Sequence, residues 1–424
     1  MKIDYVMSGS HDRITLYKED HADKEFIGKS AQVFAKYLQF LNRMTLETGF
    51  DVSISRLYNA YTESNHAPMF REHYSQAYSN IYADSGGLQV ITQGKTITDS
   101  VKRDIYTTQD YSDYSFCFDE IPLTVKFDSG TNERSNTSNK LFIPSDFVAC
   151  AEKTARNIVE QCTSLKNSKV FIIVQGNTWK DMVLWFDTIY PIVEPHLDKI
   201  CGIAPADTCM GNGYLESCDM AYACGLIFRK YPKLGRRVHF LGVGSASRIE
   251  PIVVLTKSGV IPDDVIVSID SSSMTMAFVM GKAVYNYDDR FKVFTEHLRE
   301  FYSNCMPEYE LDYDYIYDSL VTHQYQSGMS YKVMRELGCE KMRIVGALLI
   351  PMYCHWQVHL TFEKMSNELK YGKDKINKSL SLVESLDDYL KWRNTFAHKI
   401  PSKRIDRKSA YSIMDLFLPE GDVK

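Results

Sequence analysis

The sequence predicts an α/β protein, a (β/α)8 TIM-type barrel with a helical C-terminal part. Two observations lead to this fold class. Short β-branched and apolar runs alternate with longer helical patterns, as expected for buried parallel strands joined by helices. Polar residues stand directly after these runs, one or two βα units apart. Because a barrel brings the carboxyl ends of its strands to one face, these residues are expected to meet in one pocket.

The apolar runs define the expected strands and helices. The clearest strand candidates are rich in Val, Ile and Phe and cover residues 169–175, 238–243 and 264–269. Helices are expected between strands, one capped by Ser145 or Asp146 and another beginning at Ser247. The residues expected at strand ends are Asp84, Asp119, Gln175, Gly202, Gly242 and Asp270.

Two domains are predicted. Residues 1–290 form the barrel and residues 291–424 a mainly helical region, because the helical stretches lengthen after about residue 289. Segment 128–139 contains no apolar residue, which indicates an exposed loop beside the pocket face. No fixed-period repeat is visible in the sequence, which excludes solenoids and propellers.

Composition limits the class of protein. With 424 residues, 44% of them hydrophobic and 24% charged, the chain is typical of a folded soluble protein of two or three domains. Its start carries no apolar signal region, and its longest uncharged apolar stretch, residues 344–354, is too short to span a bilayer. We therefore expect no membrane partner. The ten cysteines form no CxxC pair, which favours reduced thiols and a cytoplasmic location.

Charge is distributed unevenly. The net charge of −5 argues against a uniformly basic coat for nucleic acid, yet the segment 364–408 is rich in Lys and Arg. Such a segment is either a solvated helical face or a surface that neutralises a polyanion, and both readings stay open. The candidate nucleic-acid contacts are Lys391, Arg393, Lys403 and Arg404.

The sharpest motif is Asp84-Ser85-Gly86-Gly87. Two glycines let a backbone approach a ligand closely, while Asp and Ser present polar groups beside it. Alone, the motif is more typical of a capped helix start than of a ligand site. Further motifs follow it in a fixed order, namely Phe118-Asp119-Glu120, Val174-Gln175-Gly176, Phe240-Leu241-Gly242-Val243-Gly244 and Ile269-Asp270-Ser271.

This ordered series resembles the tRNA-guanine transglycosylase superfamily over about residues 75–290. The resemblance implies a barrel enzyme in which Asp270 is the nucleophile that attacks the sugar C1′ and Asp84 is the general acid and base. It further implies that Asp119 accepts from N1 and N2 of guanine and that Gln175 donates to O6. The other substrate-binding positions implied are Ser85, Leu88, Gly176, Leu241 and Gly242, with the two leucines covering the faces of the base.

The chemistry of base exchange agrees with this allocation. Cleavage of an N-glycosidic bond develops oxocarbenium character at C1′, which one carboxylate can trap while a second group handles the proton of the base. The guanine edge offers two donors beside one acceptor, so a carboxylate such as Asp119 with an amide such as Gln175 complements it. Adenine presents the opposite pattern to Asp119.

The sequence departs from the superfamily at its zinc module. The superfamily holds a structural zinc with a CxCxxC run and a later His, whereas here isolated cysteines follow Asp270, namely Cys305, Cys339 and Cys354. We therefore predict no metal ligand and no cofactor requirement, although Cys354, His355 and His359 leave open a zinc site of different spacing. Gly202 and the residues after it also differ from the base-binding loop of the superfamily.

These departures make the chain most similar to the phage and bacterial DNA-guanine transglycosylases, which insert 7-deazaguanine bases into DNA. The resemblance implies DNA and a free 7-deazaguanine base such as 7-cyano-7-deazaguanine as partners, in the host cytoplasm if a phage encodes the protein, with a homodimer left open. The alternatives are base exchange in tRNA and a non-catalytic nucleic-acid-binding member. A dinucleotide-binding protein is a weaker rival, since Ser247 replaces the third glycine of the fingerprint that begins at Gly242.

Overall fold

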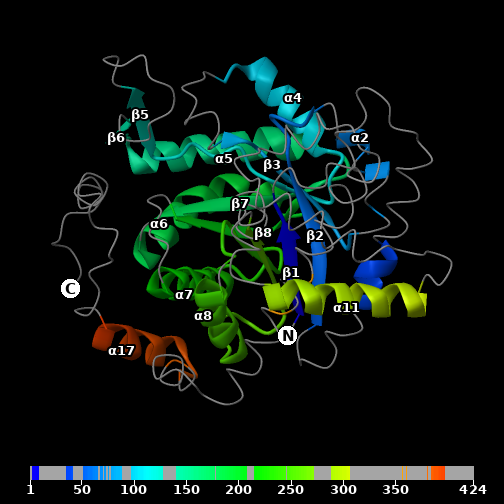
Figure 1. Cartoon of the computed structure of the whole chain (residues 1–424). Helices are drawn as coiled ribbons and strands as arrows, with labels where there is room; N and C mark the ends of the chain where they lie inside the picture. Colours follow the sequence, from blue (N-terminus) through cyan, green and yellow to red (C-terminus); the bar gives the residue numbers. More distant parts are fainter. Residues whose placement is uncertain are drawn as a thin grey trace.

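In the computed structural model of the chain, eight parallel strands of the described residues close into a barrel (Figure 1), which confirms the predicted fold class. The structure describes residues 2–8, 35–41, 51–64, 67–69, 71–72, 75, 78–87, 97–127, 140–176, 178–207, 214–244, 246–271, 288–305, 356, 360, 380 and 383–396. In chain order the barrel strands are β1 (Lys2–Met7), β2 (Asp51–Asn59), β3 (Ile81–Asp84), β4 (Tyr114–Phe116), β7 (Lys169–Gly176), β8 (Ile200–Asp207), β9 (Arg237–Phe240) and β10 (Ile266–Ser271).

The first and last strands close the barrel. β1 pairs in parallel with both β2 and β10, so that Tyr5 lies opposite Ile54 on one side and Ile269 on the other. Each remaining barrel strand pairs in parallel with its neighbour in chain order. All carboxyl ends therefore lie on the same face of the barrel.

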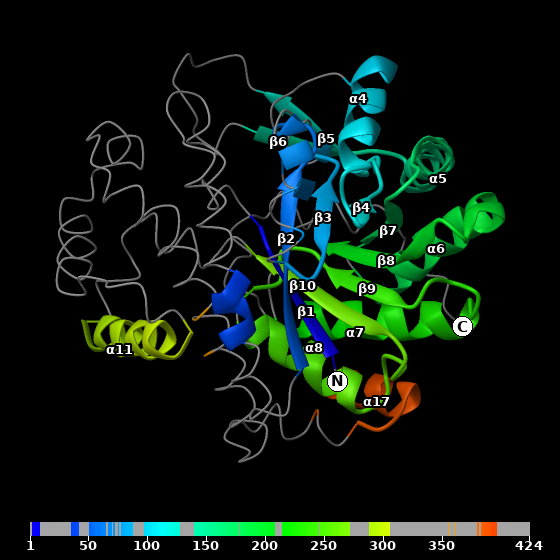
Figure 2. The same ribbon diagram turned by 90° about the vertical axis from the view of Figure 1, so that its right-hand side faces the viewer.

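Helices pack along the outside of the barrel (Figures 1 and 2). They are α4 (Asp99–Gln109), α5 (Phe147–Ser164), α6 (Trp179–Val193), α7 (Tyr214–Lys230) and α8 (Ala246–Lys257), with the short α2 (Ala67–Met69) and 3-10 turn η6 (Glu194–His196). Asp146 caps α5 by accepting from the backbone N–H of Ala149 at 3.0 Å, as the sequence predicted. The helix expected from Ser247 is α8, which begins one residue earlier. The Asp146 cap satisfies an N–H group that the first helical turn leaves unpaired.

Two strand predictions need correction. The strand expected over 238–243 ends at Phe240, because Gly242 turns the chain with a φ of 67°. Gly202 lies near the start of β8 instead of at a strand end. A Cβ on Gly202 would lie 1.8 Å from the carbonyl oxygen of Arg237, so glycine is required there by the close approach of β8 and β9.

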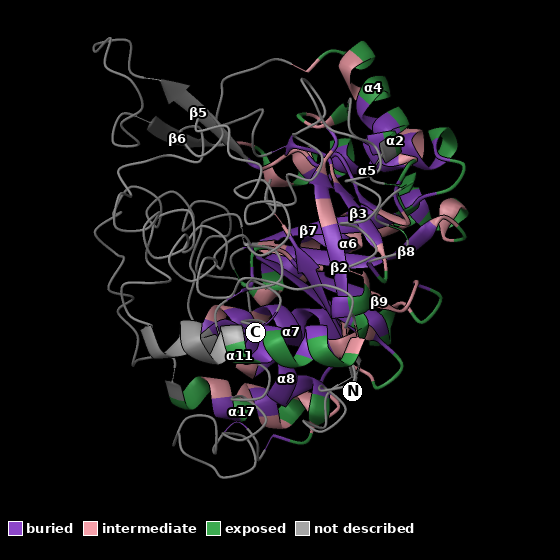
Figure 3. Ribbon diagram, turned by 45° about the vertical axis from the view of Figure 1, so that its right-hand side comes forward, coloured by how far each residue is buried: buried purple, intermediate pink, exposed green. Residues whose placement is uncertain are grey.

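Side chains fill the barrel interior. The ring of His239 lies 4.7 Å from that of Phe116, 5.5 Å from that of Tyr82 and 6.0 Å from that of Phe171. Figure 3 shows most of the barrel-strand residues as buried. The interior is thus a packed core with an aromatic layer and not an open channel.

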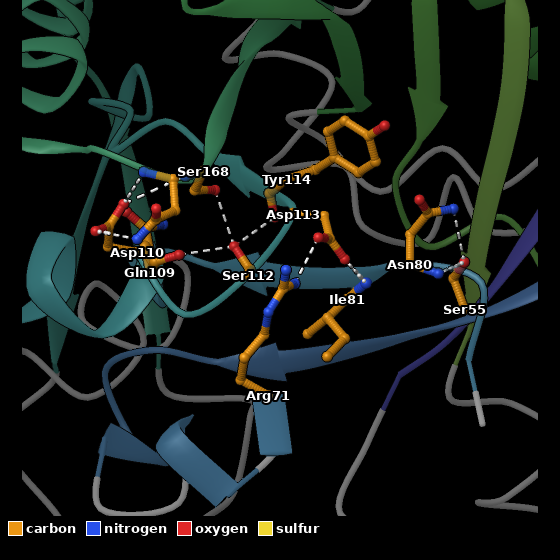
Figure 4. Close-up of polar contacts among 11 residues, drawn as sticks. Ser55, Arg71, Asn80, Ile81, Gln109, Asp110, Ser112, Asp113, Tyr114 and Ser168 are labelled. Carbon is orange, nitrogen blue, oxygen red and sulfur yellow. Dashed lines mark hydrogen bonds and ion pairs between the residues drawn. The ribbon is translucent and has the colours of Figure 1, made fainter. Parts of the chain in front are cut away.

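Loops at the amino ends of the strands are held by polar contacts (Figure 4). The carboxylate of Asp110 accepts from the backbone N–H groups of residues 166–168, directly before β7. Asp113 pairs with Arg71 and accepts from the N–H of Ile81 at the start of β3. Both carboxylates therefore have a structural role, because each is used by the backbone or by an ion pair.

Outside the barrel, β5 (Leu123–Phe127) and β6 (Lys140–Pro144) form a two-stranded antiparallel sheet. The loop expected over 128–139 joins these strands and lies outside the described residues. The two C-terminal helices with described bounds are α11 (Asp288–Cys305) and α17 (Leu386–Phe396). The predicted domain boundary at residue 290 falls inside α11. In the described ranges no helix is long and apolar enough to cross a membrane.

Helix α17 packs against α7 of the barrel (Figures 1 and 2). Arg393 donates to both carboxylate oxygens of Asp219 at 3.0 Å, and the hydroxyl of Tyr389 donates to the same carboxylate at 2.7 Å. The ring of Tyr389 stacks on that of Tyr222, with centroids 4.6 Å apart. Helix α17 is thereby held on the barrel by a charged contact and an aromatic contact.

Candidate active site

The polar residues predicted at strand ends gather on one face of the barrel. Asp84 is the last residue of β3, and Asp270 is the penultimate residue of β10. Asp119 follows β4, and Gln175 is the penultimate residue of β7. The carboxylate of Asp84 interacts electrostatically with those of both Asp270 and Asp119, so the three acids form one cluster.

Asp84 is held by a turn that requires glycine. Its carboxylate accepts from the side-chain amide of Asn59 at 3.2 Å and from the backbone N–H groups of Ser85 and Gly86. Gly86 has a φ of 76°, and a Cβ there would lie 2.6 Å from Cβ of Tyr61. Burial raises the pKa of Asp84 to about 6; the hydrogen bond from Gly86 opposes the rise, and the charge of Asp270 adds to it.

Asp119 and Gln175 form a buried pair. The amide of Gln175 donates to Oδ2 of Asp119 at 2.6 Å, and Asp119 is only 6% exposed. Burial raises the pKa of Asp119 to about 7, although the hydrogen bond from Gln175 lowers it. A Cβ on Gly87 would lie 3.4 Å from Oδ1 of Asp119, so a larger residue at position 87 would crowd this carboxylate.

The contacts of Gln175 extend its expected role. The resemblance implies that this amide donates to O6 of the base, whereas in the structure one of its two N–H donors is used by Asp119. Gln175 therefore orients the carboxylate that is expected to read the base. Its contact with O6 stays a prediction.

Asp270 is buried and held through one oxygen. Its Oδ1 accepts from the backbone N–H of Gly242 at 2.5 Å and lies 3.3 Å from Nε2 of His239. Gly242 adopts a φ of 67°, and its carbonyl accepts from Arg248 at 2.6 Å. The loop after β9 thus directs an N–H group at Asp270, which explains why the sequence places a glycine there.

Sequence reasoning missed two residues of this site. Asn59 ends β2 directly opposite Asp84 in the strand register, and an Asn closing an apolar strand is a signal that could have indicated it. His239 is fully buried in β9 between Val238 and Phe240. A single imidazole within an apolar run is a weak signal, and its pairing with Asp270 depends on the neighbouring strand.

The remaining substrate-binding candidates have different surroundings. Ser85 is buried, and its hydroxyl accepts from the N–H of Gly87 at 3.4 Å. Gly176 is the last residue of β7, and the partly buried Leu241 packs against the core beside the loop after β9. Leu88 lies outside the described residues. The structure therefore places one of the two leucines expected to cover the base.

The four basic candidates are only partly placed. Lys391 lies exposed on α17, where it pairs with an acidic residue one turn earlier. Arg393 forms an ion pair with Asp219 on α7. Its charge is therefore already paired within the protein, and we do not expect it to contact nucleic acid. Lys403 and Arg404 lie outside the described residues.

The candidate metal ligands are only partly placed. Among the described residues, no three His, Cys, Asp or Glu side chains are grouped as metal ligands would be. Cys305, at the end of α11, is a free thiol. The other candidate zinc ligands lie outside the described residues, namely Cys339, Cys354, His355 and His359. A zinc site with different spacing therefore stays a prediction from the sequence.

The buried Asp119 gives a prediction for stability. A carboxyl whose pKa rises from 3.8 in the unfolded chain to about 7 in the folded protein binds more protons when folded, so the free energy of unfolding falls as pH rises between these values. Asp119→Asn removes this slope and can still accept from Gln175. We expect the variant to exceed the wild type in stability by on the order of a few kcal/mol at pH 8 and to match it near pH 4.

Urea unfolding at several pH values measures this difference. The control is Glu152→Gln on α5, where the side chain is half exposed and its substitution should leave the slope unchanged. A parallel slope in Asp119→Asn and the wild type would show that the ionised carboxylate carries no burial cost.

The arrangement provides a held carboxylate, a second acid with a pKa near neutrality, and an acceptor–donor pair. These groups are suited to a covalent group transfer in which one acid attacks and another moves a proton. Comparison with known proteins found no matching family model and no curated protein similar in sequence.

Proposed function

We propose that the protein is a base-exchange transglycosylase that replaces guanine in DNA with a 7-deazaguanine derivative through a covalent aspartyl intermediate. The observation that carries the proposal is the position of Asp84, Asp119 and Asp270 at the carboxyl ends of barrel strands, on one face of the barrel. This arrangement matches the division of labour that the motif series implies. Of the two kinds of polynucleotide, DNA is supported by the sequence departures at the zinc module.

The first half-reaction removes guanine. A carboxylate oxygen of Asp270 forms a bond to C1′ while the C1′–N9 bond breaks and its electron pair passes to the base. Asp84 supplies the proton that the departing guanine takes up. A pKa of about 6 leaves a useful fraction of Asp84 protonated near neutral pH, as a general acid requires.

The second half-reaction inserts the new base. The carboxylate of Asp84 takes the proton from N9 of the incoming 7-deazaguanine, N9 bonds to C1′, and the ester bond to Asp270 breaks. Two displacements at C1′ leave its configuration unchanged. Both half-reactions use the same two acids, and the proton lost by Asp84 in the first is regained in the second.

Base selection is assigned to Asp119 and Gln175. The carboxylate accepts from the donors of the guanine edge, and Gln175 keeps it in place through the 2.6 Å hydrogen bond. The base must leave the duplex to reach a pocket at the strand ends. Lys391 and the basic residues that follow it in sequence are proposed to contact phosphates during this step.

Incorporation of radiolabelled guanine into nucleic acid tests the proposal. The protein is incubated with labelled guanine and either duplex DNA or a tRNA preparation, and acid-insoluble label is counted. We expect label in DNA, none with labelled adenine, and release of the label when 7-cyano-7-deazaguanine is added. Label in tRNA alone would assign exchange to tRNA, and label in neither, with a folded protein, would overturn base exchange.

A further inference from the structure

We propose that His239 is a positioning residue for Asp270. It holds one carboxylate oxygen, Oδ1, so that the other, Oδ2, faces the reacting sugar carbon. The inference rests on the proposed function, and it adds a group that neither the motif series nor the predicted site contains. It starts from the contacts of one buried imidazole in the barrel interior.

The contacts of Asp270 are one-sided. Nε2 of His239 lies 3.3 Å from Oδ1, and the backbone N–H of Gly242 donates to the same oxygen at 2.5 Å. Within the described ranges, the hydrogen bonds to this carboxylate all fall on Oδ1. Because a carboxylate only accepts, the contact with Nε2 requires a proton on that nitrogen. The two donors together hold Oδ1 and leave Oδ2 as the oxygen proposed to face the sugar carbon.

The other ring nitrogen of His239 also has a polar partner. Nδ1 lies 3.0 Å from Oγ of Ser268, the residue two before Asp270 on β10. The Ser268 hydroxyl also lies 3.0 Å from the carbonyl oxygen of Val238 and close to Tyr82, whose hydroxyl donates to the buried Asp4 at 2.7 Å. Asp4 in turn accepts from Ser55 at 2.6 Å and from further donors of β2 and the residue before β3. Polar side chains therefore lie at successive positions inside the barrel from Asp4 to Asp270.

Aromatic rings surround the imidazole of His239. The centroids of Phe116, Tyr82 and Phe171 lie 4.7, 5.5 and 6.0 Å from that of His239, and His239 itself is 0% exposed. The ring cannot turn away from Asp270 without displacing this packing. Hydrogen bonds in such a water-excluded setting are stronger than the same bonds in water.

A donor on Oδ1 is expected to affect the two half-reactions unequally. As Oδ2 bonds to C1′ and guanine departs, the carboxylate becomes an ester, loses its charge, and keeps Oδ1 as the carbonyl oxygen. When N9 of the incoming base attacks C1′, the C1′–Oδ2 bond breaks and its electron pair returns to the carboxylate. A donor on Oδ1 stabilises the charge that reappears in this second step. His239 is therefore expected to assist departure of Asp270 more than its attack.

Single-turnover measurements on the full chain separate the two steps. A labelled guanine-containing DNA gives the rate of adduct formation, and addition of guanine to the isolated adduct gives the rate of its breakdown. We expect His239→Leu to slow breakdown by about 10- to 100-fold, to slow formation less, and so to raise the steady-state fraction of adduct. His239→Gln, which keeps an N–H at the reach of Nε2, should restore breakdown.

A matched control distinguishes positioning from packing. Phe171→Leu disturbs the same aromatic layer without touching Asp270, and should lower thermal stability while leaving the ratio of the two rates unchanged. If His239→Leu does not fold, the comparison is made between His239→Gln and His239→Asn, whose shorter amide cannot reach Oδ1. Rapid breakdown is expected for the Gln variant and slow breakdown for the Asn variant.

The outcomes separate this inference from the proposed function. A wild-type protein that forms no adduct with DNA or tRNA overturns both. A wild-type adduct together with an unchanged ratio of rates in His239→Leu, or equal breakdown in the Gln and Asn variants, overturns the role of His239 alone. A changed ratio that Gln restores supports it.

Discussion

Asp270→Asn is expected to abolish both base exchange and the covalent protein–nucleic acid adduct. An amide has neither the charge nor the nucleophilicity to trap C1′, so the rate should fall by roughly 10⁴-fold or more, the scale reached when the nucleophile of a covalent enzyme is removed. The fold should survive, because the amide oxygen can still accept from Gly242, which donates to this position at 2.5 Å in the wild type. Electrophoresis under denaturing conditions with a labelled oligonucleotide measures the adduct.

The control for this substitution is Asp264→Asn. Asp264 pairs with Arg236 just before β10, and its side chain is 64% exposed. We expect this variant to form the adduct at the wild-type rate. A persistent adduct in Asp270→Asn would remove the nucleophile assignment, and with it the chemistry proposed for the barrel face.

Asp84→Asn is expected to slow exchange by about 10²- to 10⁴-fold, the usual contribution of a general acid or base. The effect should be unequal between the half-reactions. An Asn side chain can still donate a hydrogen bond to a departing base, but it cannot take the N9 proton from an incoming one. The adduct should therefore accumulate in this variant, whereas it is absent from Asp270→Asn.

The pH dependence of the second half-reaction provides a further readout. Burial raises the pKa of Asp84 to about 6, and the ionised form is the base. The rate of adduct breakdown in the wild type should therefore rise with pH up to about 6 and then level off, and this rise should be lost in Asp84→Asn. The exposed Asp99 of α4 supplies the control Asp99→Asn. An identical pH profile in Asp84→Asn and the wild type would assign the proton transfer elsewhere.

Local pattern was enough to predict much of the architecture. The run that became β7 is a nearly continuous stretch of Val, Ile and Phe, and the runs that became β9 and β10 are rich in the same residues. Such composition is typical of strands buried on both faces. Asp146 was predicted as a helix cap because capping depends only on neighbouring residues. Gly202 was placed wrongly, since its requirement comes from the backbone of Arg237 on another strand.

Part of the candidate site could also be predicted from the sequence, and part could not. Asp84, Asp119, Gln175 and Asp270 could be picked out because each follows an apolar run, and parallel strands of a barrel must end on one face. Arg393 was expected on a nucleic-acid surface from charge alone. Its ion pair with Asp219, 174 positions earlier, became visible only in the packing of α17 on α7.

By itself, the sequence determined the barrel, the face that carries the polar residues, and the identity of the three acids in the cluster, because strand composition and strand ends are local properties of the chain. Only the tertiary structure decided the environment of each acid. Burial raises the pKa values of Asp84 and Asp119, and Gly242 and His239 select one oxygen of Asp270. These contacts join residues from different strands, and their strength depends on excluding water, which no local pattern encodes.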